Sequence, residues 1–91
     1  MEFEWDDAKA AANLAKHGVA FDEILDFRWD RAILLEDTRR DYGEPRYIAL
    51  GPIASRIYVV VFTRRSPAIR LISLRKANRR EVASYEREEK A

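Results

Sequence analysis

Apolar and polar residues follow one another in an order that predicts a short first strand and then a helix. Apolar and acidic residues alternate over 2–5, which is the period of a strand. An alanine-rich helix is expected over 7–17, because Asp6 stands in its N-cap position and Gly18 just after its end. Its alanines form a narrow stripe that we expect to lie against a sheet: Ala8, Ala11, Ala12 and Ala15.

The middle of the chain predicts a second helix and four more strands. The helix, at about 21–28, is expected to direct four apolar side chains inward: Phe21, Ile24, Leu25 and Phe27. The strands are expected at 32–36, 46–50, 57–63 and 68–75, with a polar loop over 37–45. The third of these strands is apolar on both faces, which indicates a central position, and Gly51-Pro52 is expected to end the strand before it.

A last helix is expected over roughly 79–90. Asn78 stands in its N-cap position with Glu81 three residues later, which is the capping-box pattern. The predicted order is β-α-α-β-β-β-β-α, an antiparallel β-meander with two amino-terminal helices and one carboxyl-terminal helix. With the helices packed on one side of the sheet, this is a two-layer α+β domain.

The length and composition of the chain are those of one small domain. Ninety-one residues suffice for one hydrophobic core, so 1–91 is interpreted as a single domain. The absence of cysteine excludes disulfides and thiolate metal sites. No apolar run approaches the ~20 residues that cross a bilayer, so we expect a cytoplasmic protein that does not bind a membrane.

Charge is strongly segregated along the chain, although the net charge is only +1. Residues 1–30 carry eight acids against three lysines or arginines, whereas 53–80 carry eight arginines or lysines and no acid. The basic segment is mostly arginine, whose guanidinium binds phosphate through two parallel hydrogen bonds. An anionic partner is therefore expected, and a merely solvated face is the alternative.

The residue types that are missing narrow the candidate chemistry. One histidine and no cysteine cannot build a zinc site of the usual kinds, and neither a calcium loop, a phosphate loop nor a serine triad motif is present. We therefore expect no metal and no cofactor. Cleavage of RNA through its own 2′-hydroxyl fits what remains, because it needs a base for one proton and cations for the crowded phosphorane.

Three arginines are candidates for stabilising the phosphorane. Arg64 stands at a strand end, Arg70 in mid-strand and Arg75 at a strand exit. Strict alternation separates Arg70 from Arg75, so either a bulge intervenes or only one of them belongs to the site. Arg75 is favoured because the strand meets the last helix there, close to Arg79 and Arg80. The alternative for Arg70 is an ion pair on the sheet.

Two groups are candidates for moving the proton, His17 and Glu44. His17 lies in the last turn of the first helix, where the alternative is a cation that compensates the helix dipole. Glu44 and Arg46 stand at the start of a strand, where a salt bridge or a turn is the alternative. Trp5 and Trp29 are interpreted as core or partner-contact residues.

Two blocks of the chain resemble the BrnT family of toxins. Residues 3–23 follow the family pattern F-x-W-D-x-x-K-A-x-x-N-x-x-K-H-G-V-x-F-x-E, and 70–86 are similar to R-x-I-S-x-R-x-A-x-x-x-E-x-x-x-Y. The positions that match include Asn13, Lys16, His17 and Gly18 in the first block, and Arg70, Ser73, Arg75, Glu81 and Tyr85 in the second. The likeness extends over nearly the whole chain.

The resemblance implies a RelE-like fold and a ribonuclease toxin of a type II toxin–antitoxin system that inhibits translation. It also implies a BrnA-like antitoxin with a ribbon-helix-helix part, and operator DNA bound through the toxin–antitoxin complex. In this interpretation Arg64 and Arg75 stabilise the phosphorane, and Glu44 or His17 moves the proton. The RNA is held by Lys16, Arg46, Arg70, Arg79 and Arg80.

A different class of function also fits the basic segment. A non-enzymatic nucleic-acid-binding module, such as part of a repressor, would use the same cations, and its binding would depend on salt in the same way. Cleavage of purified RNA in the presence of EDTA distinguishes the enzyme from this alternative.

Overall fold

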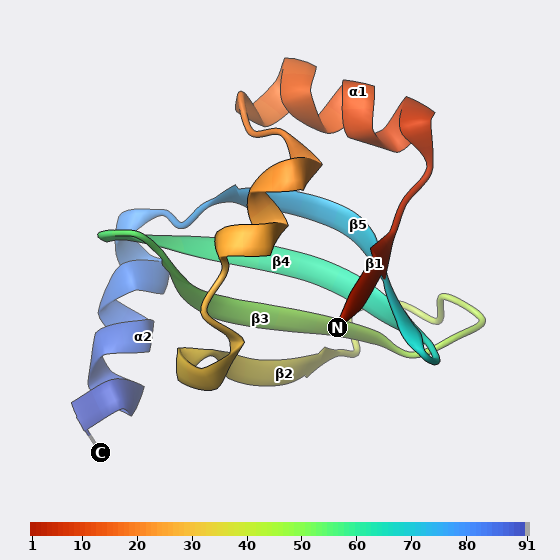
Figure 1. The fold of residues 1–91 in the computed structure, drawn as a ribbon. Coiled ribbons are helices and arrows are strands. Elements are labelled where there is room, and N and C mark those ends of the chain that lie inside the picture. The colour runs from red at the N-terminus through yellow and green to blue at the C-terminus, as the bar shows by residue number, and fades with distance from the viewer. Residues whose placement is uncertain (91) are drawn as a thin grey trace.

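The computed structural model describes residues 1–90 and confirms the α+β class (Figure 1). One five-stranded sheet has the order β1-β5-β4-β3-β2. Strands β2 to β5 form the predicted antiparallel meander, whereas β1 pairs with β5 in parallel, so the sheet is mixed. The elements are β1 (Glu2–Glu4), α1 (Asp7–His17), η1 (Phe21–Asp26), η2 (Trp29–Arg31), β2 (Ile33–Asp37), β3 (Arg46–Ile53), β4 (Arg56–Arg65), β5 (Ala68–Lys76) and α2 (Arg79–Lys90).

The predicted caps fix the ends of the two long helices. Asp6 Oδ1 accepts a hydrogen bond of 2.7 Å from the backbone N–H of Ala8, and Gly18 ends α1 with a left-handed φ of 70°. At the start of α2, the Asn78 side chain accepts from the Glu81 N–H at 2.8 Å, and the Glu81 carboxylate accepts from the Asn78 N–H at 2.9 Å. The capping box is therefore confirmed.

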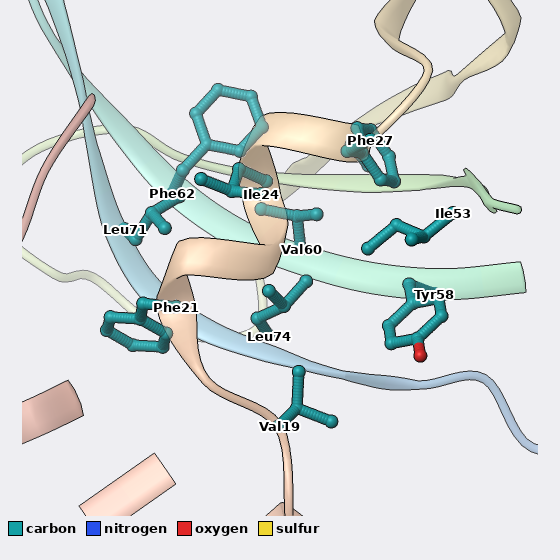
Figure 2. Close-up of a cluster of buried hydrophobic side chains, with 11 residues drawn as sticks. Val19, Phe21, Ile24, Phe27, Ile53, Tyr58, Val60, Phe62, Leu71 and Leu74 are labelled. Carbon is teal, nitrogen blue, oxygen red and sulfur yellow. The ribbon is translucent and has the colours of Figure 1, made fainter. Parts of the chain in front are cut away.

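The main core lies between η1 and one face of the sheet (Figure 2). Phe21, Ile24 and Phe27 pack onto strand residues that include Leu71 and are almost closed to solvent. The expectation that Leu25 points inward is wrong, because its residue exposure is 74%. The helix is of the 3₁₀ type, in which residues three apart share a face, so the residue after Ile24 is turned to solvent.

The other face of the sheet is covered at one end by α2. Tyr85 packs against Leu50 and Val59, and its hydroxyl donates a hydrogen bond of 2.7 Å to the carbonyl of Arg31. The prediction that every helix lies on one side of the sheet is therefore wrong. Because β3 and β4 are apolar on both faces, each face needs cover, and α2 supplies part of it for the second face.

The buried side of α1 is not the predicted alanine stripe, whose members Ala8, Ala11, Ala12 and Ala15 are exposed. The buried residue is Asn13. Its amide accepts from the Leu74 N–H at 3.1 Å and donates to the Leu74 carbonyl at 2.7 Å. Because β1 ends at Glu4, this stretch of β5 lies beyond the end of β1, and Asn13 provides the hydrogen bonds that a neighbouring strand would make.

Strand β3 continues through Gly51-Pro52 to Ile53, where the sequence predicted an end. A Cβ atom on Gly51 would lie 2.8 Å from the ring of Phe27, so the glycine leaves room for this core side chain. The glycine therefore serves packing here and does not break the strand.

One residue of β5 has no partner on β4. The pairing register shifts between Val61 and Phe62, which leaves Ile72 as the extra residue of a bulge. Arg70 and Arg75 are consequently paired with β4 residues that lie four positions apart, so both point to the same face of the sheet. Of the two alternatives that the sequence left open, the bulge is the one found.

Candidate RNA interface and active site

The side of the sheet opposite the main core carries four strand arginines, and we call it the arginine face. Its members are Arg46 on β3, Arg65 on β4, and Arg70 and Arg75 on β5. Between them lie smaller or apolar side chains of the same face: Ile48, Val61, Thr63 and Ser73. Because α2 covers only one end of this face, the arginines border an open surface.

Arg75 is held rigidly at the end of the face that lies near α2. Its two terminal nitrogens donate to the two carboxylate oxygens of Glu81, each at 2.8 Å. Hydrogen bonding to this carboxylate raises the pKa of Arg75, and the guanidinium in turn lowers the pKa of Glu81. Since Glu81 also caps α2, the cap fixes where the Arg75 charge stands.

His17 lies at the end of α1 and shares a pocket with Ser73, which stands two residues before Arg75 on the same face of β5. Burial, the charge of Lys16 and the charge of Arg75 together lower the pKa of His17 below its ordinary value of 6.5. The imidazole is therefore mainly neutral at pH 7. It lines a pocket of about 210 Å³ with Lys16 and Ser73, and further lining residues are Lys9, Ala12, Asn13 and Ile72.

The other end of the arginine face holds ion pairs that join distant parts of the sequence. Arg70 donates to Glu4 of β1 at 3.1 Å, which is the alternative that the sequence offered for it. Arg65 donates to Glu44 at 3.1 Å, with both side chains more than two-fifths exposed. Exposed pairs of this kind contribute little to stability, so a stronger anion can replace the carboxylate.

A hydrogen-bonded network joins the loop after β2 to the same end of the face. The buried Asp37 carboxylate accepts from Arg39 Nε and Nη2, each at 2.8 Å, and from the Tyr42 hydroxyl at 3.1 Å. These bonds hold the pKa of Asp37 well below its usual range. The guanidinium of Arg46 lies 4.0 Å from the centre of the Tyr42 ring, which completes the network.

Arg64 lies apart from these residues. It alternates with its neighbours on β4 and points to the core side of the sheet, where its guanidinium stands 5.1 Å from the centre of the Tyr47 ring. Arg64 and Arg75, which the sequence placed in one site, are therefore on opposite faces. One phosphate cannot contact both side chains.

The remaining predicted residues divide between the two ends of the arginine face. Lys16, His17 and Arg75 gather at one end, whereas Glu44, Arg46 and Arg70 lie at the other. The partners of Arg75 and Arg70 on β4 are four positions apart, so the two arginines are separated by ~13 Å along the strand direction. Arg79 and Arg80 are exposed in the first turn of α2. Trp5 and Trp29 pack against the main core, in line with their interpretation.

The sequence singled out none of the three loop residues that line a pocket with Arg46 at this end of the face: Arg39, Arg40 and Tyr42. They stand in a segment whose charges cancel, so the local balance of charge gave no signal. The adjacent Arg39-Arg40 pair, two residues before an aromatic, was the one available hint.

Two kinds of feature are absent from the part of the chain that the structure describes. Within residues 1–90, no group of three or more histidine, aspartate or glutamate side chains comes together as metal ligands would. No helix of this range has the length and apolar character needed to cross a membrane.

Comparison with known proteins agrees with the resemblance noted from the sequence. Residues 5–81 match the family described as "Ribonuclease toxin, BrnT, of type II toxin-antitoxin system". No curated protein matches the chain. The match covers nearly the whole chain and includes the two blocks of the family pattern from Trp5 to Glu81. The chain therefore belongs to the BrnT family of ribonuclease toxins.

Proposed function

We propose that this toxin cleaves RNA through the RNA's own 2′-hydroxyl, without a metal ion, at the end of the arginine face where His17 and Arg75 meet. One observation carries the proposal: an imidazole kept mainly neutral shares a pocket with Ser73, two residues along β5 from a guanidinium that Glu81 holds in place. A neutral imidazole can accept a proton at pH 7, and a fixed guanidinium can stabilise the charge that develops on the phosphate.

In the proposed reaction His17 takes the proton from the 2′-hydroxyl, and the 2′-oxygen attacks the neighbouring phosphorus. Arg75 and Lys16 stabilise the extra negative charge of the phosphorane. The bond from phosphorus to the 5′-oxygen then breaks, and this oxygen takes a proton from the imidazolium or from water. The products are a 2′,3′-cyclic phosphate and a 5′-hydroxyl, so atoms and protons balance.

Glu44 and Arg64 receive other roles in this proposal. Glu44 lies at the far end of the arginine face, bound to Arg65, and we assign it to shaping the RNA path and not to proton transfer. Arg64 points to the opposite face, so a contact with a protein partner suits it better than a contact with the reacting phosphate. Arg46, Arg70, Arg79 and Arg80 would hold the RNA backbone.

Membership of a type II toxin family implies a protein antitoxin as partner and RNA as target. We propose that the partner is a BrnA-like protein with a ribbon-helix-helix part, that the complex binds operator DNA, and that RNA cleavage inhibits translation in the cytoplasm. The family assignment supports these points.

The test is incubation of the purified toxin with RNA in the presence of EDTA, followed by identification of the RNA ends. We expect 2′,3′-cyclic phosphate ends from the unchanged protein, and a loss of about 10²-fold or more in rate for His17→Gln. Arg87→Gln, an exposed change on α2, is the control and should cleave normally. Tight RNA binding without cleavage would instead support the nucleic-acid-binding module.

A further inference from the structure

We propose that the pocket lined by Arg39, Arg40, Tyr42 and Arg46 is a phosphate-binding subsite that holds an uncleaved phosphate of the RNA strand. The pocket has a volume of about 350 Å³. No carboxylate group lines it. The proposal deepens the proposed function and rests on it, because it names the part of the substrate that this end of the arginine face takes.

The pocket is built before any ligand arrives. Asp37 is fully engaged, with one oxygen accepting from the Arg39 backbone N–H at 3.2 Å in addition to the side-chain bonds of Arg39 and Tyr42. The carboxylate therefore orients Arg39 and Tyr42, and the Tyr42 ring in turn supports the guanidinium of Arg46. Such preorganisation lowers the entropy that binding costs.

Two of the three arginines have hydrogen-bond donors to spare. Within residues 1–90, Arg40 and Arg46 form no ion pair, in contrast to Arg39, which Asp37 neutralises. Arg46 Nε is buried and has no hydrogen-bond partner, and the same holds for the hydroxyl of Thr63. Strand pairing puts Thr63 beside Arg46, so the orphaned donor stands next to a second unsatisfied polar group. Orphaned buried donors of this kind are rare and suit a ligand that accepts hydrogen bonds.

The chemistry of the pocket selects a phosphate. Guanidinium groups offer paired N–H donors that match two oxygens of one phosphate. A single acceptor atom on a nucleobase engages only one donor of such a pair. The pocket lies on the same face as the proposed reaction centre, since its lining residue Arg46 belongs to the arginine face with Arg75. From strand rise and spacing, the backbones of Arg46 and Arg75 lie ~16 Å apart, so the two ends hold different phosphates.

The test measures binding of a short single-stranded 2′-O-methyl RNA, which the toxin cannot cleave through a 2′-hydroxyl, at several salt concentrations. Each phosphate contact contributes about 0.7 to the slope of log K against log salt for single strands. We expect Arg40→Gln to reduce the slope by about that amount and Arg87→Gln to leave it unchanged. Both arginines are exposed, so neither change threatens the fold.

Kinetics with cleavable RNA complete the test. Arg40→Gln should raise KM several-fold and leave kcat within about twofold, which indicates a contact made equally in the ground and transition states. A reduced salt slope in a protein that does not cleave RNA would uphold the subsite and overturn the proposed reaction. Equal slopes for the two variants would overturn the subsite while the reaction stands. An unchanged slope with weaker neutralisation by the antitoxin would also overturn it, since the pocket would then bind protein.

Discussion

His17 is the single histidine of the chain, so its titration can be followed by NMR without interference from another imidazole. Arg75 is one of the charges that lower the pKa of His17, after burial and Lys16. Arg75→Gln removes a positive charge and should raise the pKa of His17, which nevertheless stays below 6.5 because burial and Lys16 remain. Arg87→Gln should leave the pKa unchanged.

The same titration predicts the pH dependence of the reaction. The neutral imidazole is the active form, so the rate should fall as the pH decreases through the pKa of His17, which lies below 6.5. In Arg75→Lys, which retains the charge, the pH at which the rate falls should stay near its original value. An NMR pKa that does not respond to Arg75→Gln would contradict the proximity on which the proposed reaction depends.

Arg64 and Arg75 provide a second comparison at the level of single residues, because they lie on opposite faces of the sheet. Arg75→Gln should reduce kcat by about 10²–10³-fold, the usual loss when one donor to a transition-state charge is removed. Arg64→Gln should leave kcat within about twofold. Urea unfolding of both variants separates this effect from instability, and a large loss of kcat in Arg64→Gln would argue against the proposed site.

At the residue scale, the sequence identified the capping residues and the position of His17 in the last turn of α1, whereas the role of Arg75 stays a prediction. It could not place Arg64, because the face on which a strand residue points depends on where alternation starts and on bulges between neighbours. Asn13 was visible only as a matching position of the family. Its role depends on an unpaired stretch of β5, which is sixty-one positions away in the chain.

At the scale of elements, the bulge of β5 makes a strong prediction about deletions. Removing Ile72 leaves a regular strand in which Arg70 and Arg75 still share a face and the two core leucines still point inward. Deletion of Ile72 should therefore be tolerated, whereas deletion of Val60 in β4 inverts every later side chain of that strand.

Circular dichroism and thermal unfolding of the two deletion variants check this expectation. The Ile72 deletion should unfold cooperatively, and it should retain binding of 2′-O-methyl RNA. The Val60 deletion should lack a cooperative transition, since it removes a fully buried side chain and misplaces its neighbours. Equal damage by both deletions would show that the bulge itself is required.

Most of the elements were predictable because local signals mark their ends. Asp6, Gly18 and Asn78 fix helix termini through bonds to nearby residues, which a sequence displays directly. The side of the sheet on which α2 packs was not predictable, since β3 and β4 are apolar on both faces and local pattern does not choose between them. The continuation of β3 through Gly51 was not predicted, because the glycine is needed for a contact with Phe27, which is distant in the sequence.

At the scale of the whole molecule, Asp37, Glu81 and His17 are among the ionisable groups that couple the fold to pH. The pKa values of Asp37 and Glu81 are lowered in the folded chain, so their contribution is complete above the ordinary values of 3.8 and 4.5 and is lost as the pH falls through the folded values. The pKa of His17 is also lowered, because burial disfavours its cation. The unfolded chain therefore binds this proton more readily, and stability decreases as the pH falls below 6.5.

Urea unfolding between pH 7.5 and pH 3 should accordingly show two losses of stability, a small one that begins below pH 6.5 and a larger one below pH 4.5. His17→Gln should remove the first and leave the second. Asp37→Asn should be less stable at pH 7 and show a weaker dependence below pH 4.5. A stability that is constant from pH 6.5 to pH 3 would contradict the assignments of these pKa directions.

The ion pairs of the arginine face carry a consequence for selectivity. Glu44, Glu4 and Glu81 each pair with one arginine of this face, so three of the eight cations between 53 and 80 already have an acidic partner in the folded chain. A polyanion that makes only one or two contacts must compete with the carboxylates that already pair with these arginines. Only an RNA strand that displaces several carboxylates at once would bind with a net gain in free energy. The free toxin would therefore bind most nucleic acids weakly.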